Sequence, residues 1–265
     1  MPKTRLGSIE FINSLPVDLG LLSGAVPADL AIEQSSPAVL NVKMAAGELD
    51  ISPVSVFAYA ERRDDLVLLS DLSISSESGV RSVVLISREP LDQLAGRPIT
   101  LTSKGRTTPA LLEVICRQRY GFEPEWVFGD ADAALLIGDE ALEAQHRLKD
   151  SGLFLTDLAE EWKAWTGKPF VFAVWAARRE FFELNPERVR EAHEALLESK
   201  RWGAARSEAV LAEAHRRTQL PYPLLEDYFA RLSHDFGPEL KEGMNHFLDR
   251  AARCGLLETA VEALG

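Results

Sequence analysis

Small polar side chains recur where a strand-like stretch gives way to a helix-like one. Such junctions lie at Asn13-Ser14, Ser35-Ser36, Ser55, Ser103 and Thr107-Thr108. Their hydroxyl and carboxamide groups donate hydrogen bonds without carrying charge, and the N-terminus of a helix attracts anions. Each junction alone is typical of a helix N-cap. If they meet at one cleft, they predict a binding site for a small molecule that carries carboxylates.

Alternating strands and helices must position these side chains. Strands are expected at 5–11, 29–34, 49–55, 66–69 with 71–76, 80–87, 99–102, 133–137, 153–156 and 170–176. Helices are expected between many of them, and residues after Arg178 are expected to be helical throughout. This alternation predicts an α/β fold with mostly parallel sheets. Ligands of such sheets bind beyond the carboxyl ends of the strands, where helices begin. The polar junctions therefore lie at the ends where a ligand is expected.

The charge of the chain limits its partners. The formal net charge is −12 at pH 7, which argues against nucleic acid and anionic membranes as partners. It does not exclude a small anion, because helix N-termini provide local positive potential. The sequence contains no Cys/His cluster with metal-ligand spacing, so we expect no metal and no cofactor. The N-terminus lacks the apolar region of a signal peptide, so a cytoplasmic protein is expected.

Several runs of sequence carry a family resemblance. In chain order they are 12–16 (INSLP), 36–41 (SPAVLN), 47–55 (GELDISPVS), 73–76 (SISS) with 80–83 (VRSV), 135–139 (LLIGD) and 165–173 (WTGKPFVFA). With these runs in this order, the chain resembles the chorismate dehydratases, which catalyse the first step of the futalosine route to menaquinone.

The resemblance implies both a fold and a reaction. The fold is the type II periplasmic-binding-protein-like α/β fold, which has two lobes, mixed sheets flanked by helices and a helical C-terminal segment. One lobe is expected to comprise 1–80 and 176–265 and the other 81–175, with the substrate cleft between them. The implied enzyme is a carbon–oxygen lyase that dehydrates chorismate to 3-[(1-carboxyvinyl)oxy]benzoate. Its partner is this small anionic substrate, and neither nucleic acid nor a membrane is expected.

Asn13 is the candidate catalytic residue. Its carboxamide offers both a donor and an acceptor at a strand-to-helix junction, although a helix cap is the alternative role. Asparagine is not basic enough to remove a ring proton, and no obvious histidine or glutamate base stands in the motifs. The enolpyruvyl carboxylate of the substrate is therefore the expected proton acceptor, with the enzyme supplying geometry.

Further residues are candidates for substrate binding, and several have a structural alternative. They are Ser36, Ser55, Arg81, Ser82, Thr107, Thr108 and Asp139. Ser82 either faces the floor of the cleft or bonds to the backbone. Arg81 either clamps a carboxylate or bridges the lobes through Asp50, Asp71 or Asp139. Asp139 either acts as an acid or base or caps the helix that follows it.

Two other functions fit the same fold. A solute-binding or sensory protein would share the architecture, because the fold alone does not set the function. The sibling enzyme dihydroxynaphthoate synthase is expected to need a histidine base near the cleft. The first histidine of this chain is His146, which favours the dehydratase.

Overall fold

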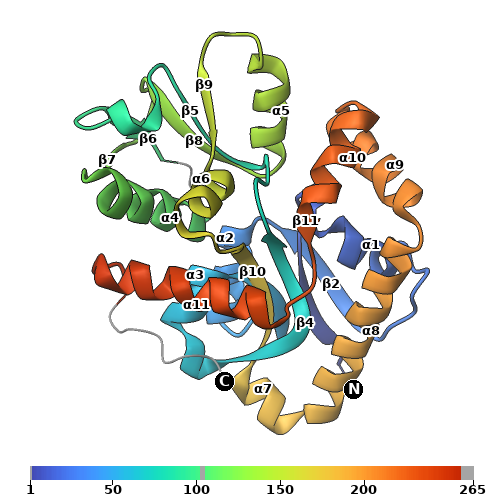
Figure 1. Cartoon of the computed structure of the whole chain (residues 1–265). Helices are drawn as coiled ribbons and strands as arrows, with labels where there is room; N and C mark the ends of the chain where they lie inside the picture. The colour runs from blue at the N-terminus through green and yellow to red at the C-terminus, as the bar shows by residue number, and fades with distance from the viewer. Residues whose placement is uncertain (1, 102–104, 258–265) are drawn as a thin grey trace.

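The computed structural model describes residues 2–101 and 105–257, which build two lobes around two mixed sheets (Figure 1). The large lobe contains a six-stranded sheet. Its strands lie in the order β11 (Leu232–Ser233), β4 (Leu66–Ser76), β10 (Phe170–Arg178), β3 (Ile51–Ser55), β1 (Thr4–Ile9) and β2 (Leu30–Ser35). The small lobe contains a five-stranded sheet in the order β7 (Glu125–Val127), β6 (Pro98–Thr100), β8 (Ala133–Ile137), β5 (Val83–Ser87) and β9 (Phe154–Asp157).

Helices flank both sheets. Those of the large lobe are the 3-10 helix η1 (Ile12–Ser14) and α1 (Leu15–Leu22), α2 (Pro37–Ala45), α3 (Val56–Glu61), α7 (Arg179–Leu184), α8 (Pro186–Ala204), α9 (Ser207–Thr218), α10 (Tyr222–Arg231) and α11 (Pro238–Arg253). The small lobe carries α4 (Thr107–Ile115), α5 (Asp139–Leu148) and α6 (Leu158–Thr166). Helix α11 crosses the front of Figure 1, packing against β10 of the large lobe and α4 of the small lobe.

Two of the expected helix N-caps, Ser36 and Ser55, are present in the structure. Ser36 precedes Pro37 and accepts a hydrogen bond from the backbone N–H of Val39 at 3.5 Å. Ser55 accepts one from Ala58 N–H at 3.4 Å and so caps α3. Both side chains satisfy N–H groups that a first helical turn leaves without partners. Strands β2 and β3, which both run parallel to β1, therefore end in polar turns at the same edge of the sheet.

Two expectations about the elements are wrong. The sheets are not mostly parallel: β5 runs antiparallel to β8 and β9, and β10 runs antiparallel to β3 and β4. Strand β10 is antiparallel because it re-enters the large lobe from the small one, a direction that local periodicity does not encode. The chain after Arg178 is also not wholly helical, since β11 pairs with the end of β4. A two-residue strand is too short to show a period.

The lobes are linked by two crossovers. One leads from β4 to β5 through residues 77–82, and the other leads from α6 into β10. The division into 1–80 with 176–265 and 81–175 stays a prediction. The second of these boundaries falls within β10, which pairs with β4 from Phe170 to Arg178.

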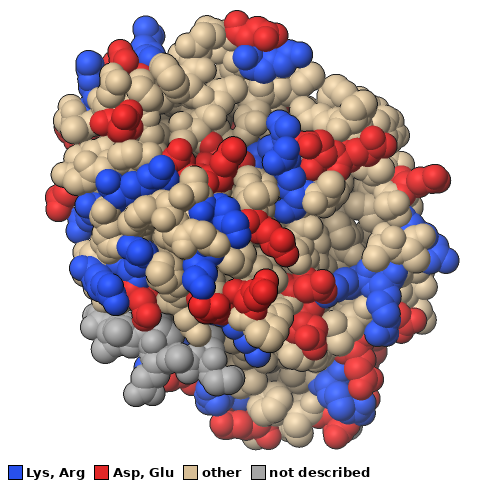
Figure 2. Space-filling model, in the orientation of Figure 1, with Lys and Arg blue, Asp and Glu red and all other residues tan. Residues whose placement is uncertain are grey.

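Charged side chains are spread over the face of the molecule drawn in Figure 2. On the face drawn in Figure 2, acidic and basic side chains are interspersed instead of forming a single basic patch. This face therefore lacks the basic footprint of a nucleic-acid interface. Within the part of the chain that the structure describes, no helix has both the length and the apolar character needed to cross a bilayer.

Candidate functional site

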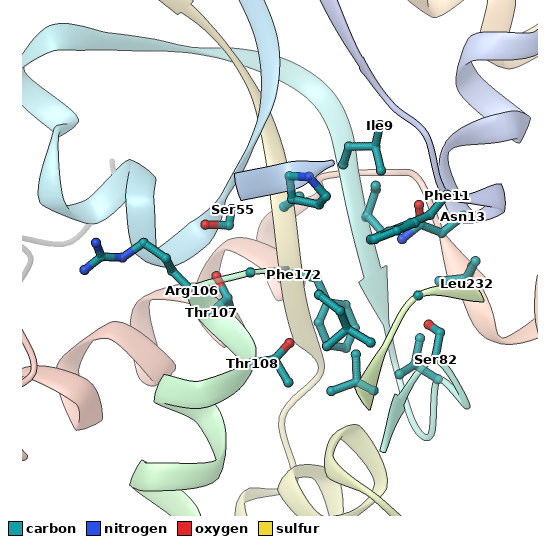
Figure 3. A pocket seen from close by; sticks show the side chains of 18 residues that line it. Ile9, Phe11, Asn13, Ser55, Ser82, Arg106, Thr107, Thr108, Phe172 and Leu232 are labelled. Atoms are coloured by element: carbon teal, nitrogen blue, oxygen red, sulfur yellow. The ribbon is translucent and has the colours of Figure 1, made fainter. Parts of the chain in front are cut away.

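A cavity lies between the lobes, where β1, β3 and β4 of the large lobe face β5, β8 and α4 of the small lobe (Figure 3). Much of its wall is apolar, with Ile9, Phe11, Phe172 and Leu232 on the side of the large lobe. Its polar side chains are few, as is usual for small-molecule sites. They are Asn13, Ser55, Ser82, Arg106, Thr107 and Thr108.

Asn13 lines this cavity from η1, the short helix between β1 and α1. Its side chain caps neither helix: the N-cap positions of η1 and α1 are occupied by Phe11 and Ser14. The Asn13 Oδ1 atom is buried and has no hydrogen-bond partner among the described residues. A buried acceptor without a partner costs about 1 to 3 kcal/mol. The structure thus removes the helix-cap alternative and leaves a carboxamide that a ligand can satisfy.

Ser55 and Thr107 accept hydrogen bonds from the protein, and this orients them as donors. The Ser55 Oγ atom accepts from Asn41 Nδ2 at 3.3 Å in addition to the α3 cap. Thr107 Oγ1 accepts from Phe57 N–H at 3.1 Å, across the two lobes. A hydroxyl group has one hydrogen and two lone pairs, so an oxygen that already accepts from the protein keeps its hydrogen for another acceptor. Both hydroxyls line the cavity and suit an anion there.

Ser82 also lines the cavity, and its hydroxyl contacts a side chain instead of the backbone. Tyr228 of α10 lies 3.1 Å from it, phenol oxygen to Ser82 Oγ. Tyr228 is fully buried, and burial raises the pKa of its phenol well above the usual range, so the phenol keeps its proton. The backbone-bonded alternative for the Ser82 hydroxyl is therefore wrong, because a residue 146 positions away in the chain packs against it.

Arg81 precedes Ser82 in a strained turn. Its φ angle is +61°, and the N–H of Ser82 donates to the carbonyl of Val80 at 2.8 Å, the pattern of a γ-turn with positive φ. The carboxylate of Asp157 holds this turn by accepting from the N–H groups of Val80 and Arg81 at 2.7 and 2.6 Å.

Arg81 is not part of the cavity wall. It forms an ion pair with Asp227 of α10, so the expected partners Asp50, Asp71 and Asp139 are wrong. Asp50, for example, is already bound by Arg5. The position of α10 beside the crossover decides this pairing, and helical periodicity does not reveal it.

Asp139 bridges the lobes instead of capping a helix. It is the first residue of α5, whose N-cap is Gly138, and its Oδ1 atom accepts from the backbone N–H of Ile12 at 3.0 Å. Burial raises the pKa of Asp139 to about 6, although the hydrogen bond from Ile12 opposes that rise. Its neighbour Gly138 lines the cavity with φ +65°, and a Cβ atom there would lie 2.8 Å from the Phe11 ring. The cap alternative for Asp139 is therefore wrong.

The structure brings five of the candidate residues to the cavity wall and places three outside it. Asn13, Ser55, Ser82, Thr107 and Thr108 line the cavity, whereas Ser36, Arg81 and Asp139 are not among its lining residues. Ser36 is close by, since Pro37 lines the cavity.

Sequence reasoning missed several residues. Arg106 lines the cavity and pairs with Glu61 of the large lobe at 2.5 Å. Phe11 and Phe172 form apolar wall, and Tyr228 supports Ser82. Phe172 lies inside a run that carries the resemblance, and Phe11 lies next to another. This placement could have marked both as cavity residues. No local signal marked Tyr228.

His234 contacts the backbone of Asn13. Its Nε2 atom is 2.7 Å from the Asn13 carbonyl oxygen, and the residue is half-buried. Burial lowers the pKa of His234 to about 4, so the ring is neutral near pH 7. A neutral ring that donates from Nε2 to this carbonyl supports the backbone of η1. His234 is not among the residues that line the cavity.

Comparison with known proteins gives the family. The model of a family described as menaquinone biosynthesis matches residues 4–253. This chain belongs to that family. It is 33% identical to the chorismate dehydratase of Thermus thermophilus over 214 residues, which cover 73% of this chain and 76% of that protein. The cavity is thus the candidate active site of a member of a biosynthetic family.

Solved structures show the same fold. Protein AF1704 from Archaeoglobus fulgidus superposes with a TM-score of 0.77 at 19% identity, covering 96% of this chain and 98% of that one. The alkanesulfonate-binding protein SsuA from Xanthomonas axonopodis, bound to MOPS, has a TM-score of 0.74 at 13% identity, with 99% and 96% covered. At these identities the likeness shows the fold alone, which is the periplasmic-binding-protein-like fold expected from the sequence.

Proposed function

We propose that this protein dehydrates chorismate to 3-[(1-carboxyvinyl)oxy]benzoate in the cavity between its lobes. The observation that carries this proposal is the pairing of the cavity hydroxyls. Ser55, Ser82 and Thr107 each lie within hydrogen-bond distance of a protein group that can donate to their oxygen. Their own hydrogens then face an apolar cavity. Such a site suits a substrate that brings two carboxylates and a hydroxyl. The site offers little positive charge and binds these groups through hydrogen bonds instead.

The reaction removes one molecule of water. The C–H bond at the ether-bearing ring carbon breaks, and its electrons form a ring double bond as the C–O bond to the ring hydroxyl breaks. Hydroxide and the proton leave together as water, and the ring becomes aromatic. The enzyme must hold the dianion, provide a route for the proton and help hydroxide depart.

The proton acceptor is the enolpyruvyl carboxylate of the substrate. Among the described residues that line the cavity there is no Asp, Glu, His or Lys side chain. A wall without such a basic side chain leaves the substrate's own carboxylate as the group that takes the ring proton. The enzyme then contributes by holding that carboxylate in a reactive pose, which can supply a large part of a rate enhancement.

Asn13 acts at the leaving hydroxyl. Its Nδ2 group donates a hydrogen bond to the departing oxygen, and the unpaired Oδ1 atom accepts from the substrate and fixes its position. Hydrogen-bond donors aimed at the charge that develops in a transition state raise the reaction rate more than donors that bind the ground and transition states equally. We therefore assign Asn13 as the catalytic residue.

The ring carboxylate lies against the first turn of α4. Thr107 and Thr108 are the first two residues of that helix and both line the cavity. The free N–H groups of a first helical turn and the hydroxyls together stabilise a carboxylate. Charge that spreads into the ring carboxylate during the reaction is stabilised at this point. Arg106, immediately before the helix, adds the positive charge found at the rim.

The direct test is incubation of the purified protein with chorismate while ultraviolet absorbance is followed. We expect loss of chorismate and formation of the aromatic product, identified by its mass. A solute-binding protein would instead show a raised melting temperature with chorismate intact, and that outcome would overturn the proposal. An analogue that lacks the enolpyruvyl carboxylate should bind without turnover. Turnover of that analogue would contradict the substrate-carboxylate route. We place the reaction in the cytoplasm, in keeping with the biosynthetic relatives.

A further inference from the structure

Tyr228 stands outside the cavity but contacts a residue of its wall. It belongs to α10, in the C-terminal helical segment, and is completely buried. Its phenol oxygen lies 3.1 Å from the Ser82 Oγ atom. The proposed mechanism does not use this tyrosine.

The direction of this hydrogen bond follows from what surrounds the two hydroxyls. The described residues offer the Tyr228 phenol no hydrogen-bond partner other than Ser82. A buried O–H that donates to nothing is costly, and the phenol keeps its proton because burial raises its pKa. Tyr228 therefore donates, and Ser82 Oγ accepts. The hydrogen of the Ser82 hydroxyl is then free to point toward another acceptor. Ser82 lines the cavity, so a bound ligand can be that acceptor.

Helix α10 holds the residue before Ser82 as well. Asp227, next to Tyr228 in the chain, pairs with Arg81, and Arg231 one turn later pairs with the same carboxylate at 3.0 Å. Two consecutive residues of α10 thus bind two consecutive residues of the crossover turn. Because that turn has a strained φ at Arg81, it needs outside support to keep one conformation.

We propose that Tyr228 is a positioning residue: it fixes the hydroxyl of Ser82 as a hydrogen-bond donor to the substrate. This inference rests on the proposed dehydration, in which Ser82 contacts the dianion. Tyr228 acts only through Ser82 and makes no contact with the substrate itself.

The test is a double-mutant cycle of Tyr228→Phe and Ser82→Ala, assayed with chorismate. Tyr228→Phe keeps the buried ring and removes only the hydroxyl. We expect kcat/KM to fall about five- to tenfold, the size of one neutral hydrogen bond. In the Ser82→Ala background the same change should have no further effect, because the group that Tyr228 positions is gone. Tyr222→Phe is the matched control, since it removes the hydroxyl of an exposed tyrosine from the same helix.

Two results from the cycle would overturn the inference. One is a Tyr228→Phe enzyme with the wild-type kcat/KM. The other is an equal fall in both backgrounds, which would mark a purely structural tyrosine. Melting temperatures of all variants show whether each is folded. If the wild type binds chorismate without consuming it, the proposed reaction fails but the cycle can be scored on Kd instead. A wild type that neither converts nor binds chorismate would overturn both proposals.

Discussion

The carboxylate of Asp139 accepts a hydrogen bond from the backbone N–H of Ile12 at 3.0 Å, and this bond joins the two lobes beside Asn13. A second bond joins them on another side of the cavity, from Phe57 N–H to Thr107 Oγ1 at 3.1 Å. The large lobe supplies both donors and the small lobe supplies both acceptors. Closure of the lobes is therefore coupled to the placement of η1 and α3, which carry or adjoin cavity residues.

Asp139→Ala should impair turnover by loosening this closure. Without the carboxylate, the Ile12 N–H loses its acceptor in the small lobe, and η1 is less well placed for catalysis. We expect kcat/KM to fall about tenfold or more, since small misplacements of a catalytic group carry large rate penalties. Asp139→Asn keeps an oxygen acceptor and should retain most of the activity. Equal loss in both variants would show that the charge of Asp139 matters more than the bond to Ile12.

Asn13→Ala should remove most of the activity without unfolding the protein. Loss of a donor aimed at a leaving or developing anion typically lowers kcat by about 10² to 10³. The melting temperature should stay near that of the wild type, because the Asn13 Oδ1 atom has no partner to lose in the described structure. Steady-state kinetics and calorimetry on the same preparation test both expectations. A wild-type rate for this variant would exclude Asn13 from the reaction.

Arg106→Gln should weaken substrate binding more than it slows the chemical step. The Arg106 guanidinium lies at the cavity rim, exposed, and paired with Glu61 across the lobes. An exposed charge is screened by salt, so the KM of the wild type should rise with ionic strength, and this rise should flatten in the variant. Arg88→Gln, which removes an exposed arginine of the small lobe paired with Asp132, is the control. A kcat that falls with unchanged KM would contradict the expected role.

Asp18 should make stability depend on pH. It is buried in α1 and accepts from the Ser8 hydroxyl at 2.6 Å. Burial raises the pKa of Asp18 to about 7, from the 3.8 expected in the unfolded chain. The folded state therefore binds the extra proton between these values, and the stabilisation from Asp18 is lost as pH rises through about 7.

Asp18→Asn isolates this effect, because an amide does not titrate and still accepts from Ser8. The free energy of unfolding of the wild type relative to the variant should fall by on the order of 2 to 3 kcal/mol between pH 5 and pH 8. Urea unfolding at several pH values measures the difference. Parallel curves for the two proteins would show that Asp18 keeps its ordinary pKa in the folded state.

Local sequence patterns marked several residues that line the cavity. A strand followed by polar, uncharged residues and a helix start is a short-range signal, and Asn13, Ser55, Thr107 and Thr108, which it marked, line the cavity. It also marked Ser36, which does not line the cavity, and Ser103, which lies outside the described residues. The α/β class and the runs that carry the family resemblance are likewise readable along the chain. The direction of the strands could not be predicted in this way. Alternation of strands and helices does not indicate that β10 re-enters the large lobe antiparallel to its neighbours.

By itself the sequence determined the family, the α/β class and a set of uncharged donors suited to a carboxylate ligand. Only the tertiary structure decided how those donors are oriented and what holds the lobes together. The Tyr228–Ser82 bond spans 146 positions and the Asp139–Ile12 bond spans 127. Such pairs form because helices and sheets pack in one particular arrangement, and periodicity reports which face of an element is buried but not which residue it meets there.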